Sequence, residues 1–166
     1  MLTTNLRLLR QHGACDGRYR VLRLALGPHF GDRTPIKLVR ILDTNGLGDA
    51  LWALLAVPQA QRAERDRLAR LFGCCCAERA LPIFESQFPD DLRPRQAIET
   101  ARRFARGRAT REELDAAGAA AEDAAWAARA AADAAGAAGA AGAAGAARDA
   151  ARDEQAEIFR QIFGAE

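Results

Sequence analysis

The chain has 166 residues, enough for one domain with a substantial core, and its 24 lysine and arginine residues nearly balance 22 aspartate and glutamate residues. The net charge of +2 excludes the strong positive charge that is typical of nucleic-acid-binding proteins. Residues 1–110 hold 19 basic and 11 acidic side chains, or +8, whereas residues 111–166 hold 5 and 11, or −6. We therefore expect an acidic C-terminal part that packs against, or lies beside, a basic body.

The first two predicted elements are short helices over residues 5–12 and 16–26, which Gly13 separates. The second of them ends at Gly27, just before a proline. Apolar residues recur along both at helical spacing. The residues expected to be buried are Leu6, Leu9, Tyr19, Leu22 and Leu26.

The next two elements are also predicted to be helices. One begins at Thr34, which precedes a proline, and stops at Asn45, which precedes a glycine. Its apolar stripe is formed by Ile36, Val39 and Leu42 or Ile41. The other opens with Asp49 as its cap and runs to Val57, where Pro58 stops it.

Residues 60–88 form the longest stretch with mixed side chains and are the best candidate for a central core helix. Gly73 weakens its middle, and Pro82 is expected to kink or split it, because proline lacks the N–H that an interior turn needs. Its large apolar residues at roughly helical spacing are Leu68, Leu71, Phe72, Cys75, Leu81, Phe84 and Phe88.

Residues 90–107 predict a helix with two clearly different faces, with Pro94 in its first position and Gly107 at its end. The core face gathers Ala97, Ile98, Ala101, Phe104 and Ala105. The opposite face carries Arg95, Glu99, Arg102 and Arg106. This charged face is either a solvated surface with Arg95–Glu99 and Glu99–Arg103 ion pairs or an arginine stripe that contacts a partner.

The tail restarts a helix at Thr110, because Thr-Arg-Glu-Glu is a capping-box signature. Alanine fills 24 of the 36 positions from 116 to 151, and glycine recurs at 136, 139, 142 and 145. Alanine favours helix, and the glycines make 136–145 the natural place for a turn or a weakened segment. We expect Trp126 to anchor this thin segment to the body. A last stripe of Ile158, Phe159, Ile162 and Phe163 is predicted to dock the C-terminus.

Helix thus follows helix, with no convincing alternating strand, so we predict an all-α fold. It is either an irregular multi-helix bundle or a stack of helical hairpins, with an alanine- and glycine-rich C-terminal segment. The predicted organisation is a helical body over residues 1–109 and an alanine-rich segment over residues 110–166 packed on it.

No stretch has 18 large apolar residues in a row, and the N-terminus lacks the apolar core of a signal peptide. We therefore expect a cytoplasmic protein that does not bind membranes. The four cysteines, three of them consecutive, make a poor disulfide framework and suit a reducing compartment.

Three motifs contain residue types found in reactive sites. Consecutive thiols such as Cys74-Cys75-Cys76 point about 100° apart on a helix and cannot close one metal site, so they are interpreted as small core residues. His12 and Cys15 lie across a turn without an oxyanion-hole signature. The glycines of residues 45–49 are better explained by a turn between helices than by phosphate binding. No catalytic residue, metal ligand or cofactor is predicted.

Three stretches follow one another in a specific order: residues 43–54 (DTNGLGDALWAL), 71–85 (LFGCCCAERALPIFE) and 91–107 (DLRPRQAIETARRFARG). Together with the alanine-rich tail, they resemble a family of small bacterial immunity proteins that accompany polymorphic toxin systems. The resemblance covers roughly residues 35–150 and implies a binding protein. The tail departs from that family, in which tryptophans recur among the alanines where this chain has its glycine repeat.

The leading hypothesis is a non-catalytic inhibitor that binds a protein toxin or effector stoichiometrically, without a small-molecule substrate. Because interfaces favour arginine anchors, the expected contact residues are Arg95, Arg102 and Arg106 and, if the effector is basic, Glu112, Glu113, Glu122 and Asp123. The alternative is a structural scaffold that self-associates into a homo-oligomer through its alanine- and glycine-rich segment. A nucleic-acid-binding protein is a third reading, against which the acidic tail argues.

Overall fold

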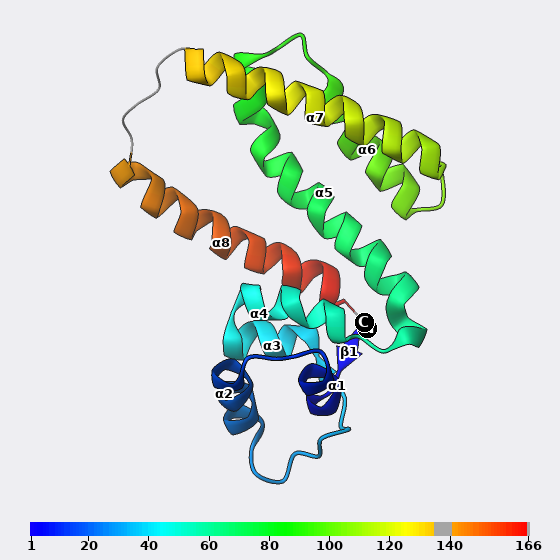
Figure 1. Ribbon diagram of the computed structural model, residues 1–166, viewed down its shortest axis with the longest axis vertical. Coiled ribbons are helices and arrows are strands. Elements are labelled where there is room, and N and C mark those ends of the chain that lie inside the picture. Colours follow the sequence, from blue (N-terminus) through cyan, green and yellow to red (C-terminus); the bar gives the residue numbers. More distant parts are fainter. Residues whose placement is uncertain (135–140, 166) are drawn as a thin grey trace. The chain divides into compact units, whose positions relative to one another are not determined.

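The computed structural model describes residues 1–134 and 141–165, apart from side chains 128–134 and 141–148. The prediction of an all-α fold is confirmed, with one small two-stranded sheet added (Figure 1). The chain divides into two compact units. Unit 1 comprises Met1–Leu68 and Asp149–Glu166, and unit 2 comprises Ala69–Arg148.

Unit 1 is built from short elements and from the end of a long C-terminal helix. In chain order they are β1 (Thr3–Thr4), α1 (Leu6–Gln11), α2 (Asp16–Leu26), β2 (Ile36–Lys37), α3 (Leu38–Asn45), α4 (Leu47–Trp52), the 3-10 helices η1 (Ala53–Ala56) and η2 (Gln59–Gln61), and α8 (Ala141–Phe163). The predicted ends of the first two helices agree with α1 and α2. Asn5 caps α1, because its side chain accepts a hydrogen bond from the backbone N–H of Leu8 at 2.8 Å.

The predicted helix start at Thr34 is wrong. Ile36 and Lys37 form strand β2 instead, which pairs antiparallel with β1, and α3 begins only at Leu38. Ile36 is buried and lies opposite Thr4, whose hydroxyl donates to the backbone oxygen of Ala56 at 2.6 Å. These contacts join segments that are far apart in the chain. The proline after Thr34 is a signal from neighbouring residues only, so it could not indicate them.

The core of unit 1 brings the two ends of the chain together. Leu6, Leu38 and Ile41 are almost fully buried. So are Phe159 and Phe163 of α8, whose rings stack with their centroids 4.3 Å apart. The predicted docking stripe at the C-terminus is thereby confirmed at three of its four positions, since Ile158 is also buried and Ile162 is half-buried.

Unit 2 contains most of α5 (Arg62–Gln87), all of α6 (Arg93–Ala105) and α7 (Arg111–Ala134). The helix α5 continues across Pro82, so the chain is not split there. It is less buried than a central core helix would be, because only Cys74 and Leu81 among its residues are buried. Helix α6 packs mainly against α7, and Ala105 of α6 and Ala124 of α7 are buried.

The alanine-rich tail is helical on both sides of residues 135–140. The turn predicted near Gly136 and Gly139 falls outside the described residues, whereas Gly142 and Gly145 belong to α8. Alanine's high helix propensity outweighs the cost of these two interior glycines, which is about 1 kcal/mol each.

Candidate partner-binding surface

The predicted arginine stripe on α6 is partly engaged by α5. The guanidinium of Arg95 donates two hydrogen bonds to Glu85, at 2.8 and 2.7 Å. Arg102 pairs with Glu78 through Nη2, which also lies 3.5 Å from the sulfur of Cys75. Such forked, charge-assisted contacts give α6 a defined position on α5.

This pattern differs from the predicted pairs within α6. Neither an Arg95–Glu99 nor a Glu99–Arg103 pair is among the ion pairs of the described residues, and Arg103 instead contacts Glu113 of α7 at 3.1 Å. Arg106 is exposed, and no ion pair is recorded for it in the described part of the chain. The role of Arg95, Arg102 and Arg106 in contacting a partner stays a prediction.

The capping box at the start of α7 is confirmed. The backbone N–H of Thr110 donates to Glu113 at 2.7 Å, and the N–H of Glu113 donates back to the Thr110 hydroxyl at 3.2 Å. The Thr110 backbone N–H lowers the pKa of Glu113, and the pKa of Glu112 is lowered by its own backbone N–H and by the Thr110 hydroxyl. Both carboxylates are therefore ionised at neutral pH, although Glu113 is occupied within unit 2.

The prediction that Trp126 anchors the tail is wrong. Its side chain is 75% exposed, whereas Ala124, two residues earlier, is fully buried. Consecutive helical residues point about 100° apart, so Trp126 projects on the side of α7 opposite to Ala124. Helix α7 packs against α6, and the buried side of α7 carries Ala124 rather than the indole ring.

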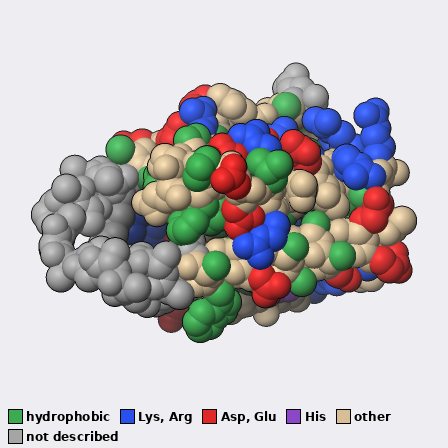
Figure 2. Space-filling view, turned by 90° about the horizontal axis from the view of Figure 1, so that it is seen from above, with side chains coloured by type: hydrophobic (Ala, Val, Ile, Leu, Met, Phe, Trp, Pro, Cys, Tyr) green, Lys and Arg blue, Asp and Glu red, His purple; other side chains and the backbone are tan. Residues whose placement is uncertain are grey.

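Two predicted acidic contact residues lie beside this tryptophan. Glu122 is one helical turn before Trp126, and Glu122 and Asp123 are both exposed. Asp123 is close enough to Arg93 to raise the pKa of that guanidinium, after the larger effect of the hydrogen bond from Arg93 to Asp91. Figure 2 shows carboxylates next to exposed hydrophobic side chains on the face that it presents.

The prediction that the three consecutive cysteines are small core residues is confirmed for Cys74 alone. Cys74 is buried, its thiol donates to the backbone oxygen of Ile98 at 3.7 Å, and burial raises its pKa. Cys75 and Cys76 are half-buried. In the described part of the chain, no three His, Cys, Asp or Glu side chains are grouped closely enough to hold a metal ion.

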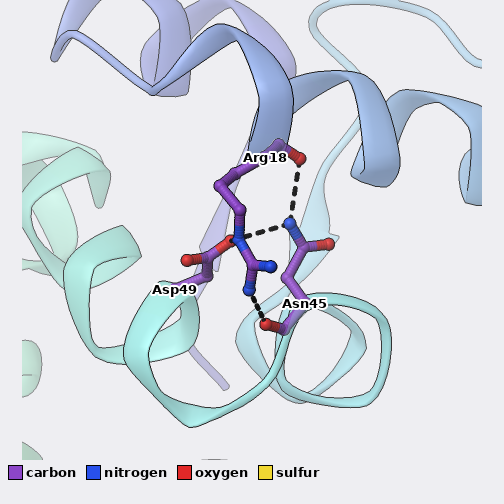
Figure 3. Close-up of polar contacts among 3 residues, drawn as sticks. All are labelled: Arg18, Asn45 and Asp49. Atoms are coloured by element: carbon purple, nitrogen blue, oxygen red, sulfur yellow. Dashed lines mark hydrogen bonds and ion pairs between the residues drawn. The ribbon is translucent and has the colours of Figure 1, made fainter.

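A polar cluster that the sequence did not predict lies in unit 1, where Arg18 of α2, Asn45 of α3 and Asp49 of α4 converge (Figure 3). Arg18 Nε and Asn45 Nδ2 each donate to Asp49 Oδ2 at 2.8 Å, and Arg18 also donates to the Asn45 backbone oxygen. Asp49 therefore ties three helices together in addition to its place in the first turn of α4. The turn between α3 and α4 at Gly46, with φ at 87°, confirms the interpretation of residues 45–49 as a helix connection.

The cluster forms one wall of a cavity of about 330 Å³. Its other walls are mostly apolar and include Leu9, Tyr19, Leu22, Ile41 and Trp52. The prediction that Asp49 caps its helix is wrong, because α4 begins at Leu47 and Asp49 lies in its first turn. The approach of Arg18 could not be predicted from the sequence, because it depends on how α2 packs against α3.

No helix in the described residues combines the length and the apolar character that a membrane span requires. Among protein families, the model described as "Imm-5 like putative immunity protein" matches residues 59–159, which is more than half of the chain. No curated protein and no solved structure gives a significant match. The family match begins later in the chain than the resemblance over residues 35–150 suggests, and it covers all of unit 2.

Proposed function

This chain belongs to the Imm-5 like immunity protein family, and we propose that it neutralises a protein toxin or effector by binding it stoichiometrically, without catalysis. The observation that supports this function is the extent of the family match. Residues 59–159 include α5, α6 and α7 completely and most of α8. An inhibitor of this kind needs a stable surface that covers its target, and binding alone is sufficient for the effect.

The contact residues that we propose are on α6 and α7, and they differ in how available they are. Arg106, Glu112, Glu122 and Asp123 are exposed at the surface of unit 2. Arg95, Arg102 and Glu113 already have partners within the unit and would contact a toxin as bound pairs.

The size of the surface is adequate for a specific complex. Helix α7 has 24 residues and is therefore about 36 Å long at about 1.5 Å per residue. A standard interface buries about 800 Å² on each partner, which one long helix and its neighbour can supply.

The proposal is tested with the complete chain, carrying an affinity tag, incubated with an extract of the source organism. We expect one protein to be retained at a one-to-one ratio, measured by mass spectrometry and by light scattering of the isolated complex. Co-expression of that protein with the chain should restore the growth of cells that the protein alone arrests. Retention of nothing but the chain itself, at a mass that rises with concentration, would refute the inhibitor and favour the self-associating scaffold.

A further inference from the structure

We infer that the outer face of α7, centred on Trp126, is the surface that contacts the toxin, and that the toxin presents a basic surface with an apolar recess for the indole ring. This inference rests on the proposed function and specifies the chemistry of its partner. It begins from the exposure of Trp126, because a tryptophan that contributes nothing to the core of its own unit is a strong candidate for an interface anchor.

The position of Trp126 on the helix defines the rest of the face. At about 100° per residue, Asp115, Glu122 and Trp126 project within about 40° of one another. Glu112 and Asp123 lie to one side of this line, and all four carboxylates are exposed. The outer face of α7 therefore combines one large aromatic ring with several exposed carboxylates.

The net charge of α7 is negative. Residues 111–134 contain six carboxylates and two arginines, Arg111 and Arg129. Arg111 reaches Asp115 only at 3.8 Å, and Glu122 has no recorded ion pair in the described part of the chain. Carboxylates around a buried anchor lose their water when a complex forms, so a stable complex requires positive groups opposite them.

These properties distinguish the face from the other exposed hydrophobic residues. Ile83 of α5 is 68% exposed and lies in the same unit, but no residue three or four positions away from it is acidic, whereas Glu122 and Asp123 precede Trp126 at that spacing. Ile83 therefore provides a matched control, because its truncation also removes an exposed apolar side chain from a helix of unit 2.

The experiment compares four full-length proteins: the unchanged chain, Trp126→Ala, the double variant Glu122→Gln with Asp123→Asn, and Ile83→Ala. The probe is the protein retained from the extract by the unchanged chain, purified and titrated at low and high salt. Because alanine is a better helix former than tryptophan, Trp126→Ala should keep its fold, and circular dichroism and the unfolding midpoint check this.

We expect Trp126→Ala to weaken binding to the probe by at least about 30-fold, as for an interface anchor. The affinity of Ile83→Ala should stay within about twofold of that of the unchanged chain. The charge-neutral double variant should bind more weakly and depend less on salt than the unchanged chain, and the probe should carry a net positive charge. Equal binding by Trp126→Ala and the unchanged chain would overturn the inference and leave the inhibitor intact. If the unchanged chain retains no protein, both fail. If it retains only a second copy of itself, the inference is overturned, because the partner is then another copy of this chain and not a basic toxin.

Discussion

The contact between Arg102 and Glu78 leads to a prediction that separates the structural arginines of α6 from the exposed one. Arg102 is 27% exposed, and its side chain reaches Glu78 and the sulfur of Cys75 on α5. An ion pair of this exposure contributes about 0.2–1 kcal/mol, and the half-buried methylene groups add a similar amount. We expect Arg102→Ala to lower the free energy of unfolding by about 1–2 kcal/mol.

A second substitution at the same position tests the reasoning further. Arg102→Met removes the ion pair as Arg102→Ala does, but it keeps most of the aliphatic stem. It should therefore lose less than half of the stability that Arg102→Ala loses.

The assay is urea or thermal unfolding followed by far-ultraviolet circular dichroism, with Arg106→Ala as the control. For a chain of this size, 1–2 kcal/mol corresponds to about 2–8 °C in Tm. Arg106 is exposed, so its replacement should change stability by less than about 0.5 kcal/mol. Equal losses in Arg102→Ala and Arg106→Ala would refute the structural role of the Arg102 pair. For the same reason, Arg106→Ala tests partner binding more cleanly than a triple arginine variant.

Three further outcomes follow from the structure. Hydrogen bonds lower the pKa of Glu113 and Asp91, so the stability that these carboxylates add is present above about pH 4 and is lost as the pH falls through their folded pKa values. Unfolding midpoints measured between about pH 6 and 3 should show this loss, and the loss should be smaller in Glu113→Gln. Phe159→Ala should cost about 3–5 kcal/mol in denaturant unfolding, because the ring is fully buried; a loss below 1 kcal/mol would contradict its place in the core. Iodoacetamide should alkylate exposed Cys15 much faster than buried Cys74, as measured by peptide mass spectrometry, and equal rates would contradict the burial of Cys74.

Signals that act within a few residues were predictable from the chain. The capping box of Thr110 and Glu113 and the helix end at Gly107 are formed by neighbours, so their geometry is encoded where they stand. The apolar spacing of residues 158–163 likewise indicated which side of the last helix is buried, because helical periodicity determines which side chains share a face. For the candidate surface, the sequence predicted the exposed acidic positions Glu122 and Asp123.

Features that depend on which helices meet could not be predicted in this way. The partners of Arg95 and Arg102 are 10 and 24 residues away on α5, rather than one turn away on α6. Ile36 became part of a strand because Thr4 is opposite it.

The misplacement of Trp126 has the same origin. Composition shows that this tryptophan is the only large apolar residue in its stretch, and a core position is then the natural expectation. Only the packing of α7 through its alanines determines which side of the helix faces inward, and that side does not include Trp126. Local sequence thus determined most of the helices and several of their ends, whereas contacts between segments far apart in the chain decided where α3 begins and which helix faces are buried.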